Sequence, residues 1–256
     1  MMLPRPSIAI STSRFDAVIF DLDGVITDTA RVHFTAWKRL FDEYLTATHP
    51  AARSFTDADY LQFVDGRARI DGVEGFLAAR EIHLPLGTSA DAPDAPTAWG
   101  LANRKNGYYL DALATEGVDV FASSVELARQ VRAAGMGTAV VTASKNRAQV
   151  LAVAGLDDLF DAHVDGIDAE QLGLAGKPEP DSFLEAARRI GVAPERAVVV
   201  EDALAGVEAG HRGGFGMVIG IDRAGQADAL RAHGADEVVT DLAEVEVVAP
   251  DLGGVP

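Results

Sequence analysis

Apolar residues along the chain occur in two different patterns. Before residue 30 and after residue 115, short runs rich in Val, Ile and Ala alternate with segments of helical periodicity. Apolar runs that lack polar alternation and are separated by helices are typical of βαβ units around a parallel sheet. The predicted strands are residues 17–20, 137–142, 162–164, 197–200, 217–221 and 237–240, and the predicted helices of this part are residues 125–134, 147–154, 182–190, 204–210 and 226–233.

The stretch between residues 30 and 115 contains helical patterns and no strand-like run. In its first predicted helix, residues 29–44, aromatic side chains recur every three or four positions, which is typical of an amphipathic helix. Shorter helical patterns cover residues 57–64, 72–79 and 106–113. A loop that contains Pro85, Pro93 and Pro96 covers residues 84–97.

These patterns predict the α/β fold class, with a Rossmann-like parallel sheet core and an inserted α-helical cap domain. The core would comprise residues 15–29 and 116–242, and the cap would comprise residues 30–115. We expect residues 1–14 to form a loose leader and residues 243–256 to form a weakly structured tail.

The composition of the chain limits the classes of molecule that it can bind. Lys and Arg total 22 against 39 Asp and Glu in 256 residues, so the net charge of −17 argues against nucleic acid and against an anionic membrane surface as partners. The sequence has no apolar span of 18 residues and no signal-peptide pattern. It also has no cysteine, which is compatible with a reducing compartment. We therefore expect a cytoplasmic protein that binds a small molecule.

Polar residues follow the predicted strands where those strands end. Asp21 and Asp23 follow the first strand, Thr142 ends the second, and Glu201-Asp202 follow the strand at 197–200. Lys177 lies between a glycine and a proline in the loop 176–180. Taken singly, each residue is more often a helix cap, a first-turn acid or a solvated cation. Together, at the carboxyl ends of one parallel sheet, they predict a binding site.

The residue types match phosphoryl transfer. Asp21 is a candidate nucleophile that forms an aspartyl-phosphate, and Asp23 is a candidate general acid and base or a metal ligand through its backbone carbonyl. Glu201 and Asp202 would complete an oxygen site for Mg²⁺ with these aspartates. Lys177 would neutralise Asp21 and the phosphoryl oxygens, and Thr142 with the N–H of Ala143 would donate to the phosphate.

Four ordered segments carry a family resemblance. Asp21-Leu22-Asp23-Gly24-Val25-Ile26-Thr27, Thr142, Lys177-Pro178 and Glu201-Asp202 resemble the four motifs of the haloacid dehalogenase superfamily. The resemblance extends from Phe15 to about Leu242. It implies Mg²⁺-dependent phosphoryl transfer through an aspartyl-phosphate, with residues 30–115 as the small α-helical cap.

Further segments are similar to the β-phosphoglucomutase subgroup of that superfamily. These segments are Asp28-Thr29 with His33 and Trp37, residues 65–69, residues 103–106 and residues 142–146. The similarity implies interconversion of β-D-glucose 1-phosphate and glucose 6-phosphate by a monomer, through a bisphosphate, with glucose 1,6-bisphosphate as activator. The substrate-binding residues that it implies are Thr29, His33, Arg69, Lys105, Ala143, Ser144, Lys145 and Asn146.

Several alternatives stay open at this point. His33 either bonds to Asp23 or packs as an interfacial histidine, and Arg67 rivals Arg69 as the phosphate ligand. The loop at 84–96 is longer than in compact members of the subgroup, which leaves the identity of the sugar open. A sugar-phosphate phosphatase on the same scaffold is the second hypothesis for the function. A receiver-type phosphoacceptor module is the third, although such a module requires neither a second aspartate nor a long helical insert.

Overall fold

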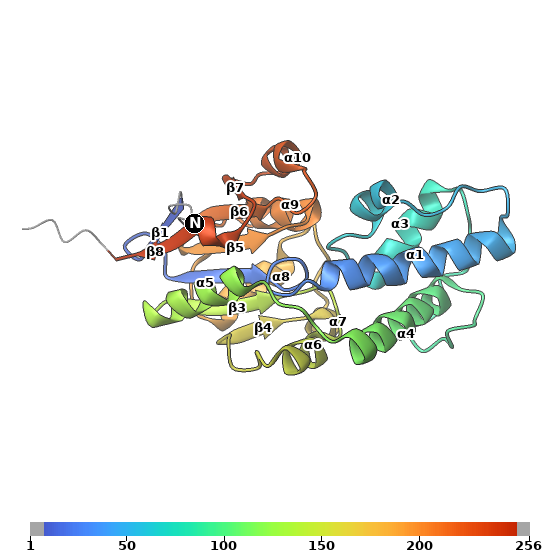
Figure 1. The fold of residues 1–256 in the computed structure, drawn as a ribbon, viewed down its shortest axis with the longest axis horizontal. Helices are drawn as coiled ribbons and strands as arrows, with labels where there is room; N and C mark the ends of the chain where they lie inside the picture. Colours follow the sequence, from blue (N-terminus) through green and yellow to red (C-terminus); the bar gives the residue numbers. More distant parts are fainter. Residues whose placement is uncertain (1–7, 250–256) are drawn as a thin grey trace, which may run out of the picture.

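A six-stranded parallel sheet forms one half of the molecule, and a block of helices forms the other (Figure 1). The computed structural model describes residues 8–249. The strand order in the sheet is β4-β3-β2-β5-β6-β7. The strands are β2 (Ala17–Asp21), β3 (Gly137–Val141), β4 (Ala162–Val164), β5 (Ala197–Glu201), β6 (Met217–Ile221) and β7 (Glu237–Val239).

Strand β2 lies at the centre of this sheet. Phe20 is in register with Val140 of β3 on one side and with Val200 of β5 on the other. From β2 the chain builds the sheet outward through β3 and β4, and then crosses to β5, β6 and β7 on the opposite side. The strand order therefore reverses at β2, and ligands bind at such a reversal point in open α/β sheets. The predicted strands are confirmed.

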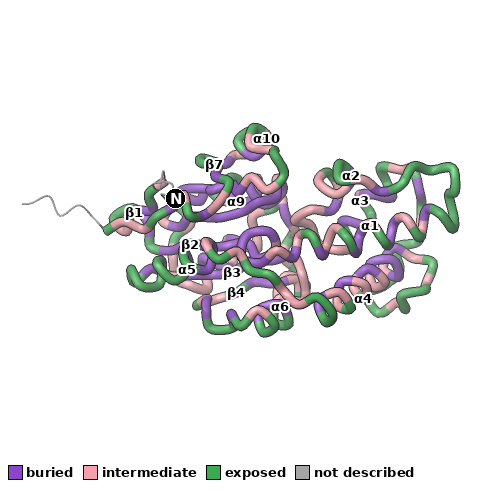
Figure 2. The backbone as a smooth tube through the Cα atoms, viewed as in Figure 1, coloured by how far each residue is buried: buried purple, intermediate pink, exposed green. Residues whose placement is uncertain are grey.

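Helices cover both faces of the sheet. Helix α5 packs on β2 and β3, whereas α8 packs on β2, β3 and β4, and α9 packs on β5 and β6. Figure 2 shows the buried interior in purple between these layers. The helices of this half are α5 (Ala122–Ala133), α6 (Arg147–Ala154), α7 (Gly166–Leu172), α8 (Asp181–Arg189), α9 (Leu204–Arg212) and α10 (Ala227–Ala232), with 3₁₀ turns at Pro194–Arg196 and Leu242–Glu244.

Helix α7 is not among the predicted helices. Its start carries a reciprocal cap: the side chain of Asp165 accepts from the backbone N–H of Asp168, and the side chain of Asp168 accepts from the backbone N–H of Asp165. Gly173 ends the helix in the left-handed conformation. This cap pattern is readable in a sequence, but α7 contains no fully buried residue, so hydrophobic periodicity does not reveal it.

The expected loose leader and weakly structured tail need correction where the structure describes them. Strand β1 (Ile8–Ser11) pairs in parallel with β8 (Val245–Val248) in a separate two-stranded sheet. Ile10 and Val245 are buried there against the sheet's apolar cluster. These strands have only four residues each and pair across nearly the whole chain, so local pattern gives little sign of them. The rest of the leader and tail, residues 1–7 and 250–256, lies outside the described residues.

The helical block (residues 29–116) consists of α1 (Thr29–Thr48), α2 (Asp57–Phe63), α3 (Arg69–Ala79) and α4 (Ala98–Glu116). Helix α4 starts eight residues earlier than the predicted segment 106–113, because the Thr97 hydroxyl caps it by accepting from the N–H of Gly100 at 3.0 Å. The block has its own aromatic centre, in which Phe41, Phe55 and Phe76 pack together.

Two linkers join the helical block to the sheet, residues 22–28 and residues 117–121. They run side by side: Asp28 N–H donates to the Asp119 carbonyl at 2.9 Å, and Phe121 N–H donates to the Ile26 carbonyl at 3.0 Å. The ends of α1 and α4 near these linkers, including Val32 and Leu113, belong to the apolar cluster of the sheet. In residues 8–249 no helix is both long and apolar enough to cross a membrane.

We expect Phe76→Ala to lower the free energy of unfolding by roughly 3–5 kcal/mol, because it leaves a cavity in a closely packed aromatic cluster. The Phe76 ring centroid lies 4.0 Å from that of Phe41 and 5.2 Å from that of Phe55. Urea unfolding followed by circular dichroism measures the loss. Leu86→Ala is the control, since Leu86 is 49% exposed and its replacement should change stability by less than about 0.5 kcal/mol. Equal losses in the two variants would contradict the packing described here.

Candidate active site

A cavity of about 380 Å³ lies between the carboxyl ends of the strands and the helical block. Its size is in the range of small-molecule sites. All of the predicted site residues except Thr29 and Glu201 line it. Both exceptions are fully buried directly behind the wall, where Thr29 contacts Asp23 and Glu201 contacts Lys177. The cavity therefore collects, from both halves of the chain, residues that the sequence placed on separate elements.

Lys177 lies between two buried carboxylates. Its ammonium donates to Asp21 Oδ1 and, at 2.5 Å, to Glu201 Oε1. The other oxygen of Glu201 accepts from the N–H of Ala203 at 2.7 Å. Burial opposes the charge on Lys177, but the two carboxylates outweigh it and hold the pKa of this ammonium above its ordinary value. Lys177 is therefore a permanent cation next to Asp21.

The acidic groups at this end of the sheet outnumber that cation. Oxygen atoms of Asp21, Glu201 and Asp202 lie within 4.8 Å of one another. Burial raises the pKa of Asp21, and the negative charges of Glu201 and Asp23 raise it further, against the attraction of Lys177. The pKa of Asp202 is also raised, by burial and then by Glu201 and Asp65. A hard divalent cation fits this oxygen-rich cluster, because it would supply the missing positive charge.

The backbone at Gly24 makes room for Asp202. Gly24 has φ +88°, and a Cβ at this position would lie 1.9 Å from Asp202 Oδ2. Only glycine permits both this conformation and this close approach. Gly206 likewise leaves space for the side chain of Glu201, since a Cβ there would lie 1.6 Å from Glu201 Oε1. The acidic cluster thus depends on two glycines.

The side chain of Asp23 is bound by hydroxyl groups and does not belong to the acidic cluster of Asp21, Glu201 and Asp202. Its Oδ1 accepts from the Thr29 hydroxyl, and its Oδ2 accepts from the Thr142 hydroxyl at 2.9 Å. His33 Nε2 lies 3.4 Å from Oδ1. Burial opposes ionisation, but the neighbouring imidazole of His33 and these hydrogen bonds outweigh it and hold the pKa of Asp23 well below its ordinary value. As a metal ligand, Asp23 has its backbone carbonyl to offer rather than its engaged carboxylate.

His33 packs as an interfacial histidine, and within residues 8–249 its Nε2 faces Asp23 without making a hydrogen bond. Its ring stacks on Tyr109 with centroids 4.0 Å apart, and its Nδ1 lies 2.5 Å from Lys105 Nζ. When Lys105 is protonated, Nδ1 accepts from its ammonium and the ring proton resides on Nε2, which faces Asp23. Burial and the charge of Arg69 lower the pKa of Lys105. Burial and the charge of Lys105 lower the pKa of His33. The imidazole of His33 on α1 therefore lies between the side chains of Lys105, on α4, and Asp23.

Arg69 begins α3 and lines the cavity. Within residues 8–249 its buried Nε has no hydrogen-bond partner, and burial lowers the pKa of its guanidinium. Arg67 also lines the cavity, but its charge acts on Asp71. A guanidinium that is half-buried and whose buried Nε has no partner is costly unless an anion binds it. The geometry thus favours Arg69 over Arg67 as an anion ligand, with buried Lys105 nearby.

The loop at 142–146 bends around its own hydroxyl groups. Thr142 Oγ1 accepts from the N–H of Ser144 at 3.0 Å, and Ser144 Oγ accepts from the N–H of Asn146 at 3.1 Å. Asn146 Nδ2 donates to Asn106 Oδ1 of α4 at 2.9 Å, which joins this loop to the helical block. Lys145 pairs with Glu170 of α7 at 2.9 Å.

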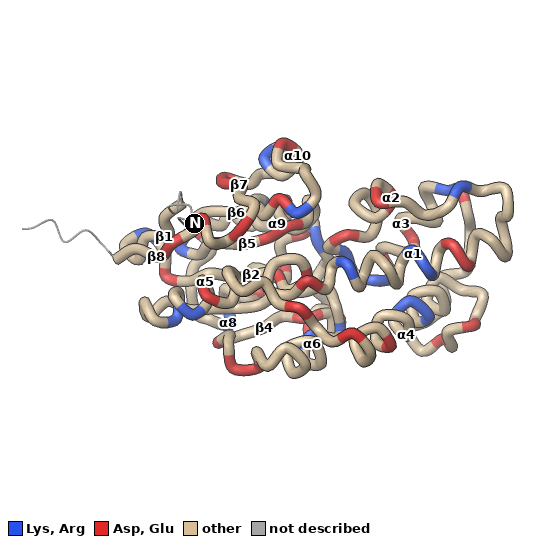
Figure 3. The backbone as a smooth tube through the Cα atoms, viewed as in Figure 1, with Lys and Arg blue, Asp and Glu red and all other residues tan. Residues whose placement is uncertain are grey.

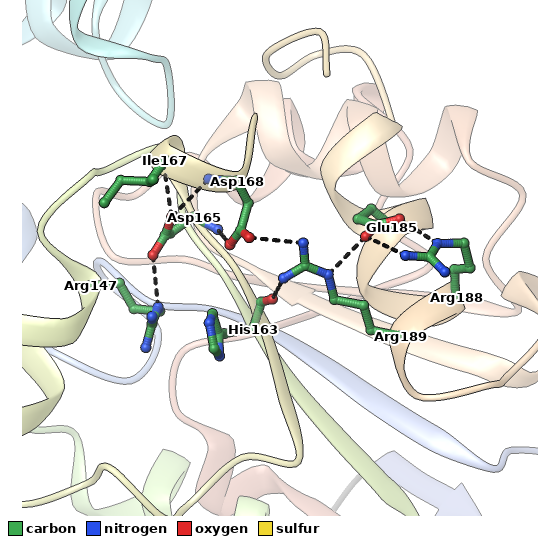
Figure 4. Close-up of polar contacts among 8 residues, drawn as sticks. All are labelled: Arg147, His163, Asp165, Ile167, Asp168, Glu185, Arg188 and Arg189. Carbon is green, nitrogen blue, oxygen red and sulfur yellow. Dashed lines mark hydrogen bonds and ion pairs between the residues drawn. The ribbon is translucent and has the colours of Figure 1, made fainter. Parts of the chain in front are cut away.

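Helix α7 forms the floor beneath this loop. Gly166 N–H donates to the Ser144 carbonyl at 2.9 Å, and a Cβ on Gly166 would lie 2.7 Å from the Ala143 carbonyl oxygen. An ionic network behind α7 holds it in place (Figure 4). In this network Arg147 binds Asp165 at 3.0 Å, and Arg189 binds Asp168 at 2.8 Å. The loop 142–146 is thus supported by residues from three helices.

Sequence reasoning missed several residues of the cavity wall. Tyr60, Asp65 and Trp99 line it from the helical block, and Glu170 lines it from α7. Asp65 lies in the segment 65–69 but was not predicted as a site residue, whereas no motif contains Tyr60 or Trp99, which only the packing of the helical block brings to the cavity. Glu170 was missed together with its helix. In Figure 3, Lys and Arg positions in blue lie where the helical block meets the sheet, in a chain that is otherwise rich in acidic positions.

Comparisons with known proteins agree with this geometry. Residues 15–214 match the family model of haloacid dehalogenase-like hydrolases. The β-phosphoglucomutase of Mycobacterium tuberculosis is 48% identical over 237 residues, which are 90% of each chain. The β-phosphoglucomutase of Bacillus subtilis is 31% identical over 232 residues, 90% of this chain and 91% of that protein. The β-phosphoglucomutase structure from Clostridium difficile has a TM-score of 0.72 at 26% identity, covering 91% of this chain and 93% of that one.

We expect Lys177→Met to lower the free energy of unfolding by roughly 3–5 kcal/mol, because it leaves two buried carboxylates without their cation. The double variant Lys177→Met/Glu201→Gln should lose less than the sum of the two single variants. Chemical unfolding without added metal, from pH 8 to pH 5, measures both effects. The deficit should shrink as the pH falls, since a carboxyl group whose pKa is raised in the folded state binds its proton there first.

Lys145→Met is the matched control for Lys177→Met. It breaks the half-exposed pair with Glu170 and should cost no more than about 1 kcal/mol. A Lys177 variant as stable as this control would refute the charge balance described above.

Proposed function

The chain belongs to the haloacid dehalogenase-like hydrolase family, and on this premise we propose that it interconverts β-D-glucose 1-phosphate and glucose 6-phosphate. One observation supports this choice above the others. The cavity has one cation, Lys177, beside the nucleophile and a second group of cations, led by Arg69 and Lys105, on the helical block. A bisphosphate intermediate requires two such centres, whereas hydrolysis of a monophosphate requires only one.

In the proposed reaction, Asp21 attacks a phosphoryl group of the bisphosphate. A bond forms between an oxygen of Asp21 and phosphorus, the bond from phosphorus to the sugar oxygen breaks, and Asp23 gives that oxygen its proton. Lys177 balances the charge on Asp21, and the Thr142 hydroxyl and the N–H of Ala143 donate to the phosphoryl oxygens. In the other half of the cycle, β-glucose 1-phosphate binds with its free 6-hydroxyl at the aspartyl-phosphate. Asp23 takes the proton from that hydroxyl, its oxygen bonds to phosphorus, the bond from phosphorus to Asp21 breaks, and the bisphosphate forms again.

We propose Mg²⁺ as the cofactor. Asp21, Asp202 and the carbonyl of Asp23 would hold it, with Glu201 behind them in contact with Lys177. Bound there, Mg²⁺ would neutralise negative charge on the phosphoryl oxygens. The protein's own residues do the remaining work: they place the nucleophile, hold the second phosphate and move the proton.

The helical block acts as the cap in this proposal. Asp23 accepts a hydrogen bond from Thr29 and lies 3.4 Å from His33 Nε2, and both residues belong to α1, so its side chain is in place when the block lies against the sheet. Gly66 lies against Ala203, where an added Cβ would come within 2.8 Å of the Ala203 side chain. Such close contact excludes water, which otherwise hydrolyses an aspartyl-phosphate. Closure thus favours transfer to a sugar over hydrolysis.

The other parts of the proposal follow the same chemistry. Glucose 1,6-bisphosphate would act as activator because it phosphorylates Asp21, and the enzyme would act as a monomer in the cytoplasm. A sugar-phosphate phosphatase is the second candidate, since family members are hydrolases and the same Asp21 chemistry ends in phosphate release when water is the acceptor. A receiver-type module is no longer needed, because the chain belongs to an enzyme family.

We expect Asp21→Asn to abolish turnover and Asp23→Asn to reduce kcat by roughly 10²–10⁴-fold, the usual share of general acid–base catalysis. The assay supplies β-glucose 1-phosphate, Mg²⁺ and a trace of glucose 1,6-bisphosphate, and it measures glucose 6-phosphate and free phosphate separately. Stoichiometric phosphate without glucose 6-phosphate would decide for the phosphatase. Normal turnover by the Asp21 variant would overturn the mechanism.

The variants Arg69→Gln and Arg67→Gln form a matched pair that tests the second phosphate centre. We expect Arg69→Gln to reduce mutase kcat/KM by roughly 10–100-fold, as for loss of a charge-assisted bidentate contact worth about 1.5–3 kcal/mol. Arg67→Gln should change it much less, because the charge of Arg67 already acts on Asp71. Release of phosphate from a small phosphate ester without a second phosphate should be unaffected in both variants. A larger loss of kcat/KM in Arg67→Gln than in Arg69→Gln would show that Arg67, and not Arg69, binds the second phosphate.

A further inference from the structure

Arg223 belongs to no motif and does not line the active-site cavity, yet it contacts three separate segments. It lies in the loop after β6, residues 222–226. Its Nε donates to the Gly24 carbonyl at 3.0 Å, and its Nη1 donates to the Thr240 carbonyl at 3.3 Å. Its guanidinium carbon lies 3.7 Å from the centroid of the Phe121 ring. The charged groups that act on it most are Asp202, Asp241 and Asp28.

The contact with Gly24 fixes backbone that adjoins two residues of the proposed reaction site, Asp23 and Asp202. Gly24 follows Asp23, and its N–H closes a turn by donating to the Thr27 carbonyl at 2.7 Å. The backbone of Gly24 lies against the carboxylate of Asp202. Because Arg223 holds the carbonyl of this same residue, it limits how far the Asp23-Gly24 turn moves relative to Asp202.

The contact with Phe121 bears on the linkers. Gly24 lies in the first linker between the two halves of the chain and Phe121 in the second. Arg223 comes from the sheet half and contacts both. A guanidinium is flat, so it can stack on an aromatic ring and donate hydrogen bonds in its own plane at the same time. One arginine side chain can therefore contact both linkers, whereas the ammonium of a lysine cannot make both kinds of contact.

A neighbouring residue of the same loop supports Asp202. Gln226 Nε2 lies 3.4 Å from the Asp202 carbonyl, and the N–H of Gln226 donates to Asp222 Oδ1 at 2.7 Å. The loop 222–226 thus contacts the backbone of two segments that carry acidic site residues. A second cavity of about 410 Å³ opens beside this loop and includes Arg223 and Gln226 in its wall.

We propose that Arg223 is a positioning residue for phosphoryl transfer, which holds the Asp23-Gly24 turn and the base of both linkers in register with the sheet. Through the turn it sets the place of Asp23, and through the linkers it sets the pivot of the helical block. This role rests on the proposed phosphoryl transfer at Asp21 and not on the acceptor, so it applies equally to mutase and to phosphatase activity.

The test compares Arg223→Ala and Arg223→Lys with the wild-type enzyme, and Arg231→Ala of α10 is the control. The side chain of Arg231 is 55% exposed, and its ion pair with Asp228 is 3.6 Å long. For Arg223→Ala we expect kcat to fall roughly 10–100-fold, as for misplacement of a catalytic group, with KM for the sugar phosphate nearly unchanged because Arg69 and Lys105 are intact. Arg223→Lys should stay impaired, and Arg231→Ala should match the wild type.

Guanidinium rescue separates positioning from mere stability. In Arg223→Ala, added guanidinium chloride at subdenaturing concentration should restore part of kcat, because the ion can enter from the second cavity and bind the Gly24 carbonyl over Phe121. Sodium chloride at equal ionic strength should not. A fall in kcat that follows the loss of folded protein in a thermal melt, with no rescue by guanidinium, would overturn the proposal, and so would a fully active Arg223→Lys. If Arg223→Ala does not fold, the Lys variant alone decides.

Measuring glucose 6-phosphate and free phosphate in the same samples keeps the two proposals apart. A wild-type enzyme that only releases phosphate would refute the mutase proposal. The ratio between variant and wild type would then still test Arg223 on hydrolysis.

Discussion

The ammonium of Lys177 between the carboxylates of Asp21 and Glu201 is the contact on which the rest of the site depends. Three charges at the carboxyl end of a buried parallel sheet are tolerated only if they compensate one another. The pair with Glu201 is complete within the protein, because the second oxygen of that carboxylate is bound by the N–H of Ala203. Glu201 therefore holds Lys177 in place, and Lys177 in turn offsets part of the negative charge around Asp21, the proposed nucleophile. Strand β2 must lie beside β5 for this to happen, which ties the chemistry to the strand order of the sheet.

Asp21 and Asp23 are two residues apart, yet the structure gives them opposite environments. Asp21 lies among other acids, so its negative charge depends on cations, whereas Asp23 accepts hydrogen bonds from Thr29 and Thr142 and faces His33. A nucleophile and a proton carrier need such different surroundings, because one must bind phosphorus and the other must exchange a proton. The partners of Asp23 come partly from α1 of the helical block. The position of the helical block therefore affects the surroundings of Asp23, the proposed proton carrier. The surroundings of Asp21, the proposed nucleophile, come from the sheet half.

Most of the sheet and the ordered motifs at its edge follow from the sequence, because a strand buried on both faces, such as β2, must be apolar throughout and its first polar residue marks its end. Helix α7 and the strands β1 and β8 do not follow from hydrophobic pattern. The first has no fully buried residue, and the other two pair only because the ends of the chain meet. The same limit applies to the site. Asp21 and Asp202 belong to contiguous motifs, whereas Trp99, Tyr60 and Arg223 reach their places only through the packing of distant segments.

A net charge of −17 repels the proposed doubly anionic substrate at long range, but the geometry of the cavity removes this conflict. Surface charges act over about 8–10 Å before salt screens them, so the acidic exterior has little effect inside a closed cavity. Lys105 and Lys177 are buried there and Arg69 is half-buried, so their attraction for phosphate is strengthened by the lower dielectric constant. That strength exists only while the helical block lies against the sheet. An open enzyme would hold the substrate weakly, so binding of the second phosphate would favour closure and closure would exclude the competing water. In the proposed mechanism, the cations that bind the second phosphate thereby also protect the aspartyl-phosphate from hydrolysis.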